Sequence, residues 1–107
     1  MGRIYSFPLD KFTLEGEETH DLVIAPVDTV VIREMRFTGA LSTPTAQFLL
    51  LSHNGIDFQR WLLPSFWIGT LVWKGRLVAT PGDVISFELG PNAGDVEANV
   101  SGYVLSP

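Results

Sequence analysis

The sequence predicts an all-β domain, built as an antiparallel sandwich or barrel from about eight to ten short strands. Two observations carry this prediction. Seven prolines and ten glycines interrupt the 107 residues at short intervals, which leaves little room for helices. Between these breaks, apolar and polar residues alternate with the period of two that is typical of half-buried strands. The chain length suits one domain, residues 1–107.

The first third of the chain predicts strands near residues 3–7, 11–14, 21–25 and 29–38. The fourth is the clearest of these, because TVVIREMRFT (29–38) is rich in β-branched residues. Its alternation slips between Ile32 and Met35, which predicts a bulge or a strand passing between two environments. The acidic segment TLEGEETHDL (13–22) is short and carries a central glycine, so we interpret it as a solvated loop rather than a helix.

In the middle of the chain, Asn54-Gly55 joins the apolar runs AQFLLLSH and IDFQRWLL. Asn-Gly between such runs is the strongest short-range signal of a β-hairpin, and it predicts strands 46–53 and 56–62. Two further strands are expected at 70–73 and 75–79, with Lys74-Gly75 breaking the run between them.

Near the end of the chain, Pro81-Gly82-Asp83 fits a type II turn, because proline fixes φ and glycine accepts a positive φ. The strand that follows, VISFEL (84–89), alternates regularly. The last strand, expected at 95–105, contains DVEANVSGYV, in which Val96, Ala98 and Val100 face one side and polar residues the other.

Composition and charge exclude several classes of function. The chain has no cysteine, so disulfides, thiolate metal sites and thiol nucleophiles are impossible. A sequence pI near 4.7, with seven scattered basic residues, argues against a nucleic-acid partner. The first residues lack the apolar run of a signal peptide, and the longest apolar stretch is too short and broken to span a bilayer. We therefore expect no nucleic-acid or membrane partner.

Polar residues give no pattern that predicts catalysis or metal binding. The acidic cluster Glu15, Glu17, Glu18 and Asp21 beside His20 lacks the ordered spacing of a calcium loop. A transition-metal site would need more ligands, and His53 lies far along the chain. Nucleophile motifs and phosphate-binding glycine patterns are absent. We therefore expect no enzyme activity, no catalytic residue, no metal and no cofactor.

The most informative segment is WLLPSFWIGTLVW (61–73), which is dense in aromatic and aliphatic residues. In one interpretation all of these side chains belong to the core, with Pro64-Ser65 at a corner. In the other, Phe66, Trp67 and Ile68 lie exposed on the subunit and are covered by another chain, as aromatic anchors of an interface are. Together with Trp61, these three residues are the candidate interface residues of this segment.

The N-terminal residues 1–12 form a possible arm, which contributes Tyr5 and Phe7 to the candidate interface. The arm is apolar and aromatic, and Pro8 limits its regular pairing. Such an arm either closes a sheet edge within its own subunit or adds to the sheet of a neighbour. The sequence leaves both arrangements open.

Six segments of the predicted strands and turns share a further pattern: the start MGRIYSF, THDLVIAPVD (19–28), VVIREMR (30–36), WKGRLV (73–78), PGD (81–83) and VSGYVL (100–105). Together they resemble small virion proteins of tailed bacteriophages. The resemblance covers most of the chain but not residues 61–69, and its motifs are those of turns and strands. It implies a β-sandwich, jelly-roll-like in topology, and a structural role without catalytic residues.

On this basis we expect a non-enzymatic capsid decoration protein that binds the assembled capsid and is located in the virion after assembly in the host cytoplasm. Its expected partners are the major capsid protein and further copies of itself, with a homotrimer favoured by the resemblance. A minor tail or tail-tip component is the alternative within the same class. A carbohydrate-binding module for host surfaces, with Trp67 as a stacking platform, is the alternative from a different class.

Overall fold

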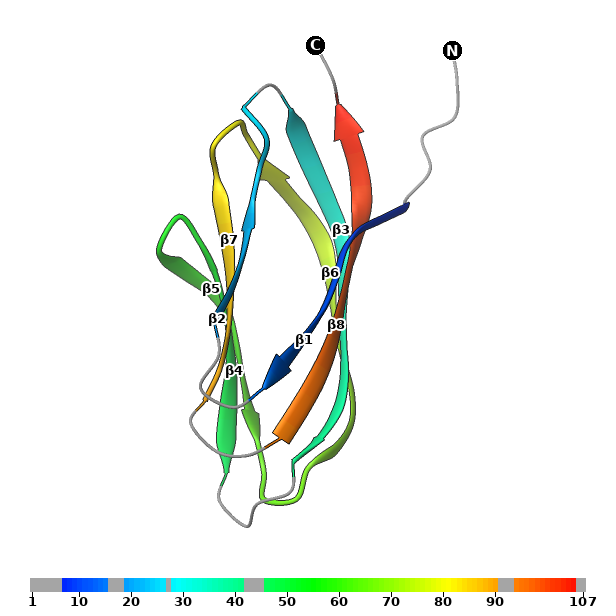
Figure 1. Ribbon diagram of the computed structural model, residues 1–107, viewed down its shortest axis with the longest axis vertical. Helices are drawn as coiled ribbons and strands as arrows, with labels where there is room; N and C mark the ends of the chain where they lie inside the picture. The colour runs from blue at the N-terminus through cyan, green and yellow to red at the C-terminus, as the bar shows by residue number, and fades with distance from the viewer. Residues whose placement is uncertain (1–6, 16–18, 27, 42–45, 91–93, 106–107) are drawn as a thin grey trace.

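Two layers of strands make up the protein, as the alternating sequence pattern predicts (Figure 1). The computed structural model describes residues 7–15, 19–26, 28–41, 46–90 and 94–105. Within these residues it contains eight strands and no helix that could cross a membrane. The strands are β1 (Phe7–Glu15), β2 (Thr19–Val23), β3 (Thr29–Leu41), β4 (Gln47–His53), β5 (Ile56–Leu63), β6 (Ile68–Ala79), β7 (Val84–Leu89) and β8 (Gly94–Leu105).

The strand order identifies the fold as a jelly roll. One sheet, which we call sheet A, has the order β1-β8-β3-β6, and the other, sheet B, has the order β2-β7-β4-β5. Each strand therefore pairs with the strand at the same distance from the other end of the series: β1 with β8, β2 with β7, β3 with β6 and β4 with β5. All these pairs are antiparallel, and eight strands in two such sheets define a jelly roll. The expected antiparallel, jelly-roll-like sandwich is confirmed.

The irregularity predicted within residues 29–38 is a shift in the pairing register of β3. Along β3, the pairing with both neighbours shifts between Ile32 and Glu34. Ile32 and Met35 are both buried in the core, so the chain gains one residue between two inward-facing positions. Arg33 is the bulged residue, since it has no partner in β6 or β8, and its side chain is exposed.

The expected break at Lys74-Gly75 was wrong. A single strand, β6, runs through it and pairs with β3 on both sides, from Ile68 opposite Ala40 to Ala79 opposite Val30. Gly75 lies beside the indole of Trp73, and a Cβ atom there would approach the ring to 3.0 Å. The glycine therefore makes room for a large ring inside a continuous strand.

One expectation about the N-terminal third needs correction, and the structure decides between the two arrangements left open for the N-terminal arm. Residues 13–15 belong to β1 and 19–22 belong to β2, so the expected acidic loop is largely strand. In the expected arm, residues 7–12 pair with β8 of the same chain and close the edge of sheet A within the subunit. The rest of the expected arm and strand 3–7, including Tyr5, lies outside the described residues, as do residues 16–18.

The turns follow the predicted chemistry. Asn54 and Gly55 have φ values of 51° and 81°, as a type I′ turn requires, and they join β4 to β5. Gly82 has a φ of 84°, and the Asp83 amide donates to the Thr80 carbonyl at 3.0 Å, which closes the expected type II turn.

The core lies between the two sheets and is built from the inward rows of every strand. Phe37 on β3 is fully buried, with its ring 5.5 Å from that of Trp61 on β5 and 6.1 Å from that of Phe87 on β7. These contacts join sheet A to sheet B through aromatic packing. The only buried polar side chain among the described residues is Gln47, which has no hydrogen-bond partner there.

Candidate functional site

Exposed apolar side chains gather where β5 turns into β6. Leu62, Phe66 and Ile68 keep 75%, 59% and 80% of their surface exposed. Leu62 lies opposite Phe48 on the outer face of sheet B, and Ile68 lies opposite Ala40 on the outer face of sheet A. Leu62 and Ile68 thus lie on either side of the turn that carries Phe66, and we call these three exposed residues the apolar corner.

The backbone at Phe66 is held in an unusual conformation. The Trp67 amide donates to the Pro64 carbonyl at 3.2 Å, and Phe66 has a φ of 53°. Phe66 thus occupies the third position of a type II turn, where glycine or asparagine is normally found. An aromatic residue in the left-handed region costs about 1–2 kcal/mol, and such strain is concentrated at functional sites. A hydrogen bond of 2.7 Å from the Leu41 amide to the Trp67 carbonyl fixes this turn to the end of β3.

The structure divides the aromatic segment between core and surface. Trp61, Trp67 and Trp73 are partly buried and pack against the core, whereas Phe66 and Ile68 are exposed. The interpretation that exposes these residues therefore holds for Phe66 and Ile68, whereas for Trp67 the core interpretation is closer, because its indole is partly buried against the core and lies beside Gly69. Of the other candidate residues, Phe7 begins β1 opposite Gly102 on β8 and so lies outside the β5–β6 turn. Leu62 was not among the candidates, although its alternation with buried Leu63 could have indicated it.

The histidine near the acidic cluster connects the two sheets. The Nε2 atom of His20 on β2 lies 2.8 Å from Oδ2 of Asp10 on β1, which is outside the acidic cluster. The imidazole stacks on Phe12, with ring centroids 3.7 Å apart. Asp21 of the cluster instead accepts a hydrogen bond from Ser86 at 2.8 Å, while Glu17 and Glu18 lie outside the described residues. Among the described side chains, no three potential metal ligands come together.

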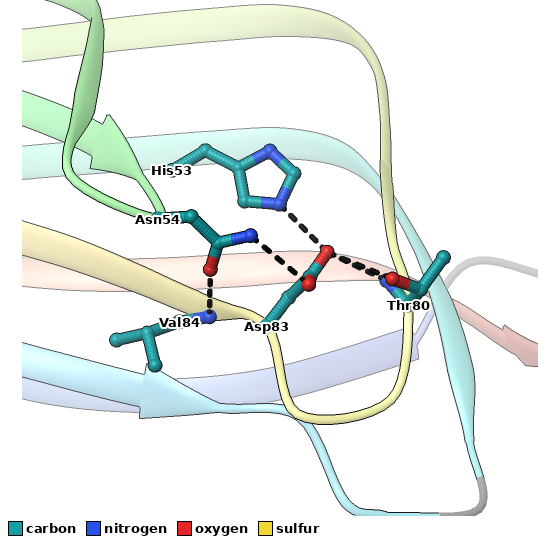
Figure 2. Close-up of polar contacts among 5 residues, drawn as sticks. All are labelled: His53, Asn54, Thr80, Asp83 and Val84. Atoms are coloured by element: carbon teal, nitrogen blue, oxygen red, sulfur yellow. Dashed lines mark hydrogen bonds and ion pairs between the residues drawn. The ribbon is translucent and has the colours of Figure 1, made fainter.

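The second histidine belongs to a polar network around Asp83, which Figure 2 shows. Oδ2 of Asp83 accepts hydrogen bonds from His53 Nε2 at 2.8 Å and from the backbone amide of Thr80 at 2.9 Å. Oδ1 accepts from the Asn54 side chain at 3.0 Å, and the Asn54 oxygen accepts from the Val84 amide at 2.8 Å. The network ties the β4–β5 turn to the β6–β7 turn.

This network braces two turns and lacks the parts of a catalytic triad. A carboxylate only accepts hydrogen bonds, so His53 carries a proton on Nε2. The described residues place no hydroxyl group in hydrogen-bonding contact with the imidazole, and activation of a nucleophile would require one. The hydrogen bonds from Asn54, His53 and Thr80 lower the pKa of Asp83 well below its ordinary value, because they favour the ionised carboxylate.

We expect Asp83 to make the fold sensitive to acid. Because its pKa is lower in the folded than in the unfolded chain, ionised Asp83 stabilises the fold above about pH 4, and this contribution is lost as the pH falls further. Asp83→Asn should lower the urea midpoint at pH 7 and flatten its decline between about pH 4 and pH 2. The control is Asp57→Asn, since Asp57 is exposed on β5. Parallel pH profiles for the two variants would contradict this role.

The sequence did not predict the gathering of basic residues on sheet A. Arg33, Arg36, Lys74 and Arg76 are four of the seven basic residues of the chain, and pairing of β3 with β6 brings them together. Their positions depend on the bulge at Arg33 and on a register that joins residues far apart in sequence. The basic residues are scattered along the sequence, but these four share one sheet in the fold.

Comparisons with known proteins assign the chain to no family. No family model matches it, and neither does any curated protein. Among solved structures, it is similar to the nucleoplasmin-like N-terminal domain of Drosophila FKBP39, with 14% identity and a TM-score of 0.43. The match covers 91% of this chain and 92% of that one. At this distance the likeness carries no argument about function, and the fold assignment rests on the strand order.

Proposed function

We propose that this chain is a non-enzymatic structural protein of a tailed-phage virion, a capsid decoration protein that binds the assembled capsid through its apolar corner. The observation that carries the proposal is Phe66, an aromatic residue that a strained turn holds on the surface. The resemblance of the strand and turn segments to small virion proteins supports the same role. By that resemblance the protein associates into trimers and is located in the virion after assembly in the host cytoplasm.

The chemistry of the apolar corner suits a binding surface. Burying a large aliphatic or aromatic side chain contributes about 1.5–3 kcal/mol, so Leu62, Phe66 and Ile68 together offset part of the cost of association. A protein that binds the assembled shell and not its free subunits stabilises the shell by mass action. The two histidine–aspartate pairs join strands and turns, which supports a mechanical rather than a catalytic role.

The test is binding to tail-less capsids of the same phage, measured by cosedimentation. We expect Ile68→Thr to weaken binding about fivefold to tenfold, because it removes apolar area from the corner while keeping a β-branched residue in the strand. Ile56→Thr is the matched control, since Ile56 is 73% exposed on the hairpin at the start of β5 and lies outside the corner.

Three results would overturn the proposal. Capsid binding that Ile68→Thr leaves unchanged would exclude the corner as the binding surface. Binding to isolated tails but not to capsids would make the chain a minor tail or tail-tip component. A change in tryptophan fluorescence with host wall polysaccharide, in a protein that does not bind the particle, would make it a carbohydrate-binding module.

A further inference from the structure

A second exposed surface, in which two basic residues lie between two valines, runs along β6. The outward-facing residues Val72, Lys74, Arg76 and Val78 alternate with the inward-facing Trp73 and Leu77. The two valines are 41% and 43% exposed, so each end of the basic pair is flanked by an accessible apolar side chain. We call these four residues the β6 strip.

The basic pair of the strip borders a hollow on the outer face of sheet A. Its volume is about 690 Å³, and it is lined by Arg33, Glu34, Lys74, Gly75, Arg76 and Ser101. Three cations therefore face one carboxylate, in a chain whose formal charge is −5. Glu34 lies 3.9 Å from Lys74 Nζ, and neither Arg33 nor Arg76 has an ion pair within the described residues. The hollow can thus accept additional negative charge.

The strip also lies on an open strand edge. β6 is the last strand of sheet A and pairs only with β3 among the described strands. An edge strand presents backbone N–H and C=O groups that an extended segment can bind as an additional strand. A second β6 is a poor occupant, because antiparallel pairing of two copies would bring Lys74 and Arg76 opposite basic residues.

We infer that the β6 edge binds an extended acidic segment of a partner protein as a ninth strand. Two carboxylates at alternate positions of this segment face Lys74 and Arg76, and apolar side chains two positions beyond each carboxylate face Val72 and Val78. Backbone hydrogen bonds supply affinity, and the apolar–acidic–acidic–apolar alternation supplies specificity.

A peptide fits this surface better than a nucleic acid does. A polynucleotide gains affinity by neutralising many phosphates, which needs a long basic track. Here the basic residues occupy a short stretch with Glu34 in its centre, on an otherwise acidic protein. Two carboxylates match the basic pair of the strip in number and in sign of charge. The inference goes beyond capsid binding through the apolar corner and stands independently of it.

The test is an NMR titration of the full chain with a nine-residue capped peptide that alternates threonine with valine, glutamate, glutamate and valine. We expect amide shifts along residues 72–78, and Arg76→Glu should weaken binding about tenfold. Lys11→Glu is the matched control, because Lys11 is an exposed basic residue on β1 at the other edge of the same sheet.

A charge exchange gives the sharpest outcome. A variant with both Lys74→Glu and Arg76→Glu should no longer bind the glutamate peptide. It should instead bind a peptide in which lysines replace the two glutamates. Equal affinity of the unaltered protein for both peptides, or amide shifts at β1 or β5 instead of β6, would overturn the inference. Tighter binding of an oligothymidylate of equal length at residues 72–78 would also overturn it, in favour of a nucleic acid.

Discussion

Gly102→Ala should lower the free energy of unfolding by about 3 kcal/mol, because an added Cβ overpacks a close contact between β8 and β3. A Cβ on Gly102 would collide with the carbonyl oxygen of Val31 and approach Cα of Ile32 to 3.0 Å. Both neighbours belong to the backbone of a central strand, so neither can rotate away. Urea denaturation should show this loss, and Tm should fall by roughly 12 °C.

Gly55→Ala separates this collision from a general effect of replacing glycine. Gly55 has a positive φ but open space around its Cα, so alanine there should cost only about 1 kcal/mol. Gly102 is not among the described residues with positive φ, and its cost comes from the neighbouring backbone alone. A loss at Gly102 no larger than that at Gly55 would show that β8 can move away from β3.

Features that depend on a few neighbouring residues were predictable from the sequence. The Asn54-Gly55 hairpin and the turn at Gly82 follow from the φ values that these residues accept. The bulge at Arg33 was visible because a gained residue shifts the alternation of apolar positions. The sandwich itself follows from period-two alternation, which shows that each strand has one buried face.

Features that depend on long-range pairing were not predictable in this way. Gly75 looks like a strand break in the sequence alone, but β6 pairs with β3 up to Lys74 and again from Leu77, so one strand runs through it. The basic hollow exists only because β3 and β6 are neighbours, with Glu34 opposite Lys74. Between Leu63 and Ile68 a turn interrupts the alternation, so the pattern could not show that Trp67 faces inward and Phe66 outward.

Phe66→Gly should separate binding from stability at the apolar corner. We expect it to weaken capsid binding at least thirtyfold, as the loss of a central aromatic anchor does, under the proposal that the corner contacts the capsid. The same change should leave the free energy of unfolding within about 1 kcal/mol of its original value. Relief of the left-handed strain offsets the greater freedom of glycine in the unfolded chain. Cosedimentation with tail-less capsids and urea denaturation measure the two effects.

Phe66→Ala identifies the source of each effect, because it removes the ring but keeps a Cβ in the left-handed turn. The two variants should bind capsids equally weakly, whereas the alanine variant should be about 1 kcal/mol less stable than the glycine variant. If Phe66 instead belonged to the core, both changes would cost about 3–5 kcal/mol of stability. Stability losses of that size with unaltered binding would make the β5–β6 turn a packing element. Weak binding with intact stability would mean that the turn tolerates strain in order to present an aromatic side chain to a partner.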